Sequence, residues 1–317
     1  MDDRAELSPV QEQILRDLLA TGRPRPTFPA DLADELRAEM EERLEPVVAA
    51  LRGDDKLFVT KAKLRDALTC EGLAYGREQD TGFEWNERNV RGTLGHRAIQ
   101  RLVMGGYEQT PVDAVEEIIE QTVAQDEPAD LAAFLRSLAP GARAELVGEV
   151  SDAVTKFAID WPPVRREWSP RVESPQRTTL GNGRITLLGR ADLALGRPRG
   201  AQSGTFLCDL KSGYEHSAHL YDVRFYALVE TLARRVPPFR IAIYYFDSSR
   251  FDALDVDEAL LRSEARRVAD GVARHAEVRA KRLDDLARVP NPLCPHCALY
   301  DGCEPGREFV AAGRDLD

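Results

Sequence analysis

Residues 184–211 read RITLLGRADLALGRPRGAQSGTFLCDLK, and this stretch decides the fold. Arg184–Leu195 and Gly204–Leu210 are short runs rich in apolar and β-branched side chains, so each of them predicts a strand. The preceding run, Arg171–Thr179, predicts another strand, and Gly181-Asn182-Gly183 after it is a favourable hairpin turn. The sequence therefore predicts three successive strands.

Two of these predicted strands carry side chains that can bind a metal ion or take part in catalysis. Side chains alternate along a strand, so Asp209 and Lys211 are expected on one face, opposite to Cys208 and Leu210. If Asp192 lies beside Asp209 on an adjacent strand, the two carboxylates form a hard-oxygen site that suits Mg²⁺ or Mn²⁺. Lys211 beside such an ion would orient a water or stabilise developing negative charge. The peptide carbonyl of Leu210 is a further candidate ligand, and Cys208 is expected to be a buried structural thiol.

Amphipathic helical patterns precede and follow the strands. They cover a short helix opening at Ser8-Pro9 and residues 29–51 (where Pro46 is expected to bend or break the helix), 60–70, 89–104, 111–156, 217–235 and 256–286, and a further strand is predicted at 240–246. From residue 89 onward the order is helix, helical insertion, three strands, helix, strand. This order predicts an α/β core with added helices.

The net charge of −11 is unevenly distributed along the 317 residues. Residues 1–56 have a net charge of −6 and residues 107–152 a net charge of −9, which leaves the rest of the chain at +4. An acidic composition therefore does not exclude a nucleic acid partner, because the remainder can face a phosphate backbone.

The sequence contains no signal for membrane insertion or export. No run approaches the roughly 20 apolar residues that span a bilayer, and the first residues lack the basic-then-apolar order of a signal peptide. We therefore expect a cytoplasmic protein with no membrane partner.

Three of the five cysteines lie within ten residues near the end of the chain. Cys294, Cys297 and Cys303 have the spacing C-x2-C-x5-C, and Cys70 lies far upstream. In a reducing compartment such spacing is typical of a metal site. Four thiolates suit either an iron–sulfur cluster or a structural Zn²⁺, and His296 is an additional candidate ligand for zinc.

The order of these motifs resembles the RecB-like branch of the PD-(D/E)XK nucleases, which includes the AddB nuclease domain and the CRISPR-associated iron–sulfur exonucleases. The branch has a helical Gly-x-x-x-His-like motif, matched by Gly92–His96, then Gly-x-x-Asp, matched by Gly189–Asp192. Asp-x-Lys follows at Asp209–Lys211, and a final Gln-x-x-x-Tyr is matched by Asp222–Tyr226. Asp222 departs from the pattern, since glutamine is expected there, and its role is left open.

The resemblance implies a restriction-endonuclease-like core, in which a mixed central sheet is flanked by helices, and a phosphodiesterase site. It implies as metal ligands His96, Asp192, Asp209 and the carbonyl of Leu210, with Lys211 as the water-orienting base and Tyr226 along the DNA path. Glu173 is a candidate for an additional carboxylate, although a glutamate on an edge strand is usually solvated. Candidate contacts to phosphates or bases are Arg190, Arg224 and the stretch Arg165–Trp168.

The same resemblance implies that Cys70, Cys294, Cys297 and Cys303 bind a [4Fe–4S] cluster, with Zn²⁺ as the alternative. Because Cys70 and Cys294 are far apart in the sequence, a shared centre would close a very long loop and brace the core. We expect this centre to have a structural role, and a redox-sensing role is left open.

The expected organisation is a helical N-terminal extension at 1–56, a nuclease domain at 57–305 with an acidic helical insertion at about 107–157, and a C-terminal tail at 306–317. The expected function is a metal-dependent DNA nuclease, an exonuclease or end-processing enzyme, in repair, recombination or defence. No Gly-x-x-x-x-Gly-Lys-[Ser/Thr] motif occurs, so a helicase motor would come from a separate partner. The alternatives are a structure-specific endonuclease, a DNA-binding or assembly subunit with a vestigial or partner-activated site, and a zinc-braced scaffold.

Overall fold

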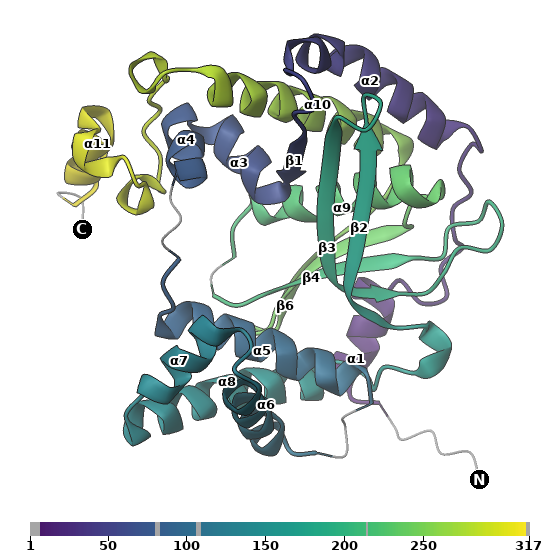
Figure 1. Ribbon diagram of the computed structural model, residues 1–317. Helices are drawn as coiled ribbons and strands as arrows, with labels where there is room; N and C mark the ends of the chain where they lie inside the picture. The colour runs from purple at the N-terminus through teal and green to yellow at the C-terminus, as the bar shows by residue number, and fades with distance from the viewer. Residues whose placement is uncertain (1–6, 80–82, 106–108, 214, 315–317) are drawn as a thin grey trace. The chain divides into compact units, whose positions relative to one another are not determined.

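The computed structural model describes residues 7–79, 83–105, 109–213 and 215–314 (Figure 1). The chain divides into two compact units. The first unit contains residues up to 30, 84–175 and 190–257, and the second contains 31–83, 176–189 and 258 onward. Within the described residues, no helix is both long enough and apolar enough to cross a membrane.

Six strands of the described residues form one mixed sheet, in the order β1-β3-β4-β5-β6 with β2 paired to β3. They are β1 Leu57–Thr60, β2 Arg171–Leu180, β3 Ile185–Leu195, β4 Phe206–Lys211, β5 Arg240–Tyr245 and β6 Arg250–Asp255. The β1–β3 and β4–β5 pairs are parallel, and the β3–β4 and β5–β6 pairs are antiparallel. This sheet with its flanking helices confirms the predicted α/β class.

The turn between β2 and β3 forms as the sequence predicts. Gly181, Asn182 and Gly183 all have positive φ angles, at 56°, 55° and 81°. Glycine and asparagine tolerate this left-handed region, so the turn forms at little steric cost. It joins two long strands, and both strands run through the two units.

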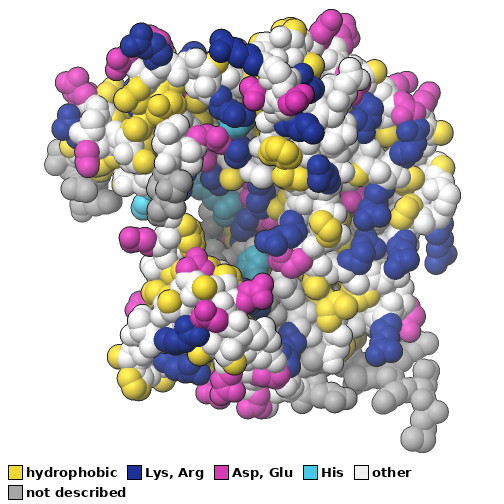
Figure 2. All heavy atoms as spheres, viewed as in Figure 1, with side chains coloured by type: hydrophobic (Ala, Val, Ile, Leu, Met, Phe, Trp, Pro, Cys, Tyr) yellow, Lys and Arg dark blue, Asp and Glu magenta, His cyan; other side chains and the backbone are white. Residues whose placement is uncertain are grey.

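In the first unit, helices pack around the central strands (Figure 1). These elements are α1 Pro9–Gln13, a π-helical turn η1 Ile14–Leu18, α5 Glu87–Val103, α6 Pro111–Gln125, α7 Ala129–Ser137, α8 Pro140–Asp160, the 3₁₀ turn η2 Arg166–Trp168 and α9 His219–Arg234. Pro128 precedes α7 and Pro140 begins α8, so the two prolines divide the predicted helical stretch 111–156 into three helices. Helix α9 packs on β4 and β5, and α5, α6 and α8 pack together. Figure 2 shows acidic side chains gathered at the lower left of the view, where Figure 1 places α6, α7 and α8.

In the second unit, helix α10 is the centre of a helical layer. The elements are α2 Leu32–Ala50, α3 Lys61–Thr69, α4 Glu71–Gln79, α10 Glu258–Ala280, the 3₁₀ turns η3 Leu283–Asp285, η4 Cys294–His296 and η5 Tyr300–Gly302, and α11 Glu304–Arg314. Helices α2, α3 and α4 pack on α10. Thr60 caps α3, since its side chain accepts a hydrogen bond from the Lys63 N–H at 3.4 Å.

The structure corrects several element predictions. Helix α2 continues through Pro46 without a break, and α10 ends at Ala280, earlier than predicted. Elements α4, β6 and α11 form where the sequence predicted none. Strand β6 was not predicted because all of its residues are exposed or half-buried, so its hydrophobic pattern is weak.

Candidate functional site

The candidate site of the first unit collects side chains from five elements. Helix α5 contributes His96, β2 contributes Glu173, β3 contributes Asp192, β4 contributes Asp209 and Lys211, and α9 contributes Asp222 and Tyr226. The antiparallel register of β3 and β4 ends at Leu193↔Cys208, so Asp192 and Asp209 are the next residues on the two strands. Residues that are distant in the sequence are thereby brought to one place.

Two glycines explain how α5 comes close enough to present its histidine. A Cβ atom at Gly92 would lie 3.0 Å from Ser212 Oγ, and one at Gly95 would lie 3.3 Å from the ring of Phe246. The His96 ring packs edge-on against Phe246, with 5.8 Å between ring centroids. The small residues before His96 therefore let the helix approach the ends of the strands.

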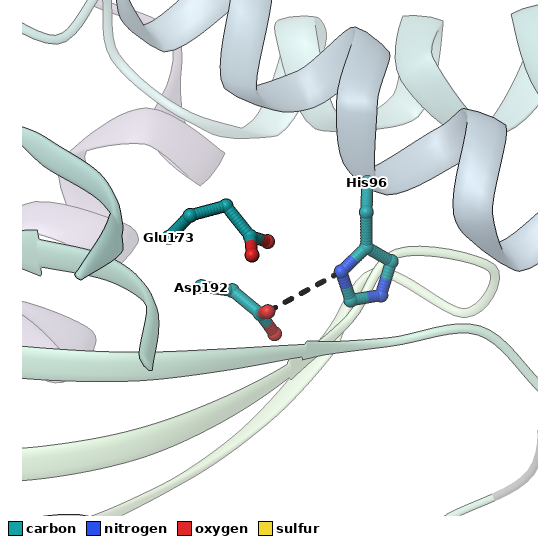
Figure 3. A group of neighbouring side chains, drawn as sticks. All are labelled: His96, Glu173 and Asp192. Carbon is teal, nitrogen blue, oxygen red and sulfur yellow. Dashed lines mark ion pairs between the residues drawn. The ribbon is translucent and has the colours of Figure 1, made fainter. Parts of the chain in front are cut away.

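His96, Glu173 and Asp192 form a potential metal-binding group (Figure 3). Each offers one ligand atom, and these atoms all lie within 4.8 Å of one another. His96 Nδ1 is 3.4 Å from Asp192 Oδ1, and both carboxylates point toward the imidazole in Figure 3. The other oxygen of Asp192 accepts a 2.7 Å hydrogen bond from the Leu210 N–H, which fixes its orientation.

Glu173 reaches this group through an unusual backbone conformation. Its φ is 47° although it lies within β2, and this left-handed conformation costs a non-glycine residue about 1–2 kcal/mol. Its carboxylate is held by Gln100 Nε2 at 2.5 Å and by Arg190 Nε at 2.5 Å. Glu173 is therefore directed into the site. Gln100 was not predicted, but its position four residues after His96 on α5 places both side chains on one helix face.

Lys211 lies between two carboxylates. Its Nζ forms an ion pair with Asp209 Oδ2, and it is 3.3 Å from Asp222 Oδ2. Asp209 itself is only 1% exposed. Asp222 is the residue that departs from the motif. It contacts Lys211 of the same site, and this contact is a structural role that the sequence left open.

The buried charges of Asp192 and Asp209 affect their neighbours. Burial opposes protonation of His96, but the hydrogen bond and negative charge of Asp192 together with Asp209 outweigh it and raise the pKa of His96. Burial, and then the same two carboxylates, raise the pKa of Tyr226. Tyr226 is 3% exposed, so its side chain is buried beside these carboxylates.

The site opens into a groove of about 700 Å³. Arg88, Arg97 and Arg190 line it together with Asn86 and Asn89. Arginine and asparagine side chains are suited to contacts with phosphate oxygens. Of the other predicted contact residues, Arg224 lies 5.5 Å from the ring of Tyr221 on α9, and Arg165–Trp168 leads into and forms the turn η2. Cys208 is fully buried, as expected, and burial raises the pKa of its thiol.

The other four cysteines come together in the second unit. Cys70, Cys294, Cys297 and Cys303 line one pocket, and all are free thiols. Backbone N–H groups point at two of the sulfurs, from Val289 to Cys70 Sγ at 3.4 Å and from Asn291 to Cys294 Sγ at 3.3 Å. A Cβ atom at Gly306 would lie 3.3 Å from Cys303 Sγ and 3.4 Å from Cys294 Sγ. The chain therefore packs closely around the sulfurs.

Glu71, next to Cys70, forms a buried ion-pair network that the sequence did not indicate. Its carboxylate accepts hydrogen bonds from Lys281 Nζ at 2.8 Å, from Arg274 Nη1 at 2.7 Å and from the Ala287 N–H at 2.9 Å. The hydrogen bond from Lys281 contributes most to lowering the pKa of Glu71 to about 2. This network ties the segment of Cys70 to the segment that leads toward Cys294.

Comparison with known proteins identifies a family. The family model for the PD-(D/E)XK nuclease superfamily matches residues 59–304, which is more than three quarters of the chain. No curated protein has a matching sequence. A solved structure described as "Crystal structure of SSO0001" is 11% identical, covers 86% of this chain and 96% of its own, and has a TM-score of 0.34. A score this low carries no argument about the fold.

Proposed function

The chain belongs to the PD-(D/E)XK nuclease superfamily, and on that premise we propose that it is a metal-dependent deoxyribonuclease of the RecB-like branch. We propose that it acts on single strands or DNA ends, as an exonuclease or end-processing enzyme. The observation that carries the proposal is the convergence of His96, Glu173 and Asp192 beside Lys211. Their order along the chain supports the RecB-like assignment.

The side chains present fit a divalent metal. Two carboxylates suit Mg²⁺ or Mn²⁺, and Mn²⁺ also accepts an imidazole; the three ligand atoms already lie within 4.8 Å of one another. His96, Glu173 and Asp192 would hold the ion, with Asp209 and the carbonyl of Leu210 completing the ligands. Such an ion neutralises non-bridging phosphate oxygens and lowers the pKa of a bound water.

Lys211 would act beside this centre as a hydrogen-bond donor. Paired with Asp209 and Asp222, its Nζ is positioned by two carboxylates. A positioned ammonium can orient the attacking water and stabilise the negative charge that develops on the phosphate. Asp222 then serves as a positioning residue, in place of the glutamine of the family motif.

The experiment that tests this function compares cleavage of end-labelled single- and double-stranded DNA in Mn²⁺ by the wild type, Asp192→Asn and Lys211→Ala. Each substitution is expected to lower the rate by about 10²-fold or more. Arg52→Gln, a change at an exposed arginine of the other unit, serves as the matched control and should leave cleavage intact. The position of the label in the products gives the polarity.

Absence of cleavage by the folded wild type on every DNA tested would refute the nuclease proposal. The protein would then be better described as a DNA-binding or assembly subunit, which a gel-shift measurement on the same substrates would reveal. Internal products from both strands without end dependence would replace the exonuclease with the endonuclease alternative.

We propose further that Cys70, Cys294, Cys297 and Cys303 bind a structural [4Fe–4S] cluster. Four thiolates at 2.3 Å from one tetrahedral Zn²⁺ would lie about 3.8 Å from one another. Within the described part of the chain, no three of these sulfurs lie within 4.8 Å of one another, a spread that favours a larger group than a single ion. The N–H groups that point at Cys70 and Cys294 also suit cluster sulfurs.

Elemental analysis of anaerobically purified protein tests the cluster. We expect the protein to contain iron and acid-labile sulfide in equal amounts. Both should be lost in Cys294→Ser and retained in Cys208→Ala. Cys208 is a matched control because it is buried in the other unit. Stoichiometric zinc without sulfide would refute the cluster and support the zinc alternative.

The setting of this activity is also part of the proposal. The chain lacks the phosphate-binding motif of a helicase motor, so we propose that it receives DNA ends or strands from a separate helicase or from a recombination or defence protein. We propose a cytoplasmic location, because free thiols such as these persist in a reducing compartment.

A further inference from the structure

The first unit contains a second cavity, of about 490 Å³, at the end of β3 where the chain turns into β4. Six of its lining residues matter for recognition: Arg25, Trp168, Arg197, Arg199, Gln202 and Phe239. We call this cavity the turn pocket. None of these residues belongs to the metal group at His96, and the family motifs do not include them.

The loop that forms one wall of the turn pocket is rigidly built. Gly196 has a φ of 77°, and a Cβ atom there would lie 2.1 Å from the Gly204 carbonyl oxygen, so the two arms of the loop are packed backbone to backbone. Arg199 and Gln202 exchange two backbone hydrogen bonds, at 3.0 and 3.1 Å. The Ser203 N–H donates to the Pro26 carbonyl at 2.9 Å. The loop thus presents its side chains from a fixed backbone.

The turn pocket offers flat surfaces on which a base can stack. The Arg25 guanidinium lies over the Phe239 ring, 3.7 Å from its centroid, and Arg25 Nη1 donates to the Ala20 carbonyl at 2.9 Å. Trp168 is half-buried, and its carbonyl accepts the Gly196 N–H at 2.5 Å. Indole rings and stacked guanidinium planes are the surfaces that single-stranded nucleic acid uses for stacking.

The charge of the turn pocket suits a phosphate. Three arginines and a single acidic residue, Glu167, line it. Among the residues that the structure describes, Arg197 and Arg199 have no ion-pair partner, so their guanidinium groups are available to an anion. A guanidinium fork matches the oxygens of a phosphate with two parallel hydrogen bonds.

The position of the turn pocket connects it to the candidate active site. The Arg171 guanidinium donates to the carbonyl of Gly196, a pocket-lining residue, at 3.0 Å, and Glu173 of the metal group follows Arg171 by two positions on β2. We propose that the turn pocket binds one nucleotide of the DNA strand whose neighbouring phosphate lies at Asp192, with the base on Trp168 or on the Arg25–Phe239 pair and the phosphate on Arg197 and Arg199. This inference rests on the proposed nuclease function for the identity of the strand.

Calorimetric binding without divalent metal tests the turn pocket independently of cleavage. The ligands are thymidine 5′-monophosphate, thymidine and a short oligothymidylate. The double variant Arg197→Gln with Arg199→Gln should lower the affinity for the two phosphate-bearing ligands about tenfold or more and leave the affinity for thymidine unchanged. The double variant should also lower the slope of log affinity against log salt by about 0.7 for the oligonucleotide. The matched control is Arg52→Gln with Arg282→Gln, which removes the same charge from exposed positions of the other unit.

A second variant separates stacking from charge. Trp168→Leu keeps an apolar side chain against the core, and it should lower the affinity for all three ligands about tenfold. Equal binding by the turn-pocket variants and the control double variant would overturn the proposal. Cleavage of DNA with no binding difference refutes the turn pocket and leaves the nuclease intact, whereas the expected binding pattern without any cleavage refutes the nuclease and leaves the turn pocket as a nucleotide site.

Discussion

Glu173 is the residue whose placement depends most on its surroundings. Its left-handed backbone inside β2 is unfavourable for a glutamate, and Gln100 and Arg190 hold its carboxylate in place. Strained residues of this kind persist where neighbouring structure determines them, often at functional sites. The sequence supplied only the suggestion of an extra carboxylate, since neither the φ angle nor the partner on α5 can be read from local pattern.

The first prediction concerns metal affinity at Glu173. Glu173→Gln removes the negative charge but keeps the length and hydrogen-bonding capacity of the side chain. We expect Mn²⁺ affinity, measured by titration with the spin resonance of free Mn²⁺, to fall about 10–100-fold. Gln100→Leu should produce a smaller loss in the same direction, because it removes the 2.5 Å hydrogen bond and not a ligand. Unchanged affinity in Glu173→Gln, with Glu167→Gln as the control, would remove Glu173 from the site.

The second prediction concerns His275. This imidazole is 1% exposed, and burial lowers its pKa below the usual 6.5 of histidine. The unfolded chain therefore binds a proton at a higher pH than the folded protein does, so stability is complete above pH 6.5 and falls as the pH is lowered below it. Urea unfolding of His275→Leu should show a flatter pH dependence below 6.5 than the wild type. The exposed His216→Gln should retain the wild-type slope, and a retained slope in His275→Leu would contradict the prediction.

At the scale of elements, the α4 helix is tied to the end of α10 by Glu71. Lys281 and Arg274 both contact this carboxylate, and their own side chains are one third to one half exposed. Because solvent screens such partners, we expect Glu71→Gln to lower the free energy of unfolding by only about 1–2 kcal/mol. Urea denaturation measures the loss. Glu277→Gln, on the exposed side of α10, should cost less than half as much, and equal costs would contradict the network's role.

The elements that the sequence predicted and missed differ in a physical way. The β2–β3 turn was predictable because Gly181, Asn182 and Gly183 favour left-handed backbone on their own. A break at Pro46 does not form because helix propensity is a local property, while the packing of Leu44 and its neighbours against other elements holds α2 together past the proline. The amphipathic helix α11 was missed because it follows so closely on Cys303 that the segment was interpreted as a tail.

At the scale of the molecule, the sequence predicted which residues belong to the candidate sites but not how these residues contact one another. The motifs identified His96, Asp192, Asp209 and Lys211. They did not reveal that Asp209 forms an ion pair with Lys211, or that Glu173 lies in one group with His96. Likewise the spacing of the cysteines indicated a centre, and the network of Glu71 beside it was invisible because its partners lie more than 200 residues away. Long-range pairing is set by the tertiary structure, and local patterns in a single sequence do not reveal it.

A fourth prediction concerns the proposed cysteine centre as a brace of the second unit. Cys294→Ser should expose the segment that carries Cys294, Cys297 and Cys303, because it removes one of the four thiolates through which that segment would share a centre with Cys70. Limited proteolysis with mapping of the cuts is expected to show new cleavage between residues 281 and 305, and none within β4 or β5. Cuts distributed equally through both units would indicate global unfolding and contradict a local brace.

The interleaving of the two units along the chain has a consequence for protein synthesis. Helix α2 ends at Ala50, but α10, on which it packs, begins only at Glu258. At 5–20 residues per second, the ribosome needs on the order of 10–40 s to produce the segment that covers α2. During that interval Leu36, Met40 and Leu44, all fully buried in the finished protein, have no permanent cover. The nascent chain is therefore a natural client for chaperones that shield apolar helices, and slow translation would lengthen its exposure.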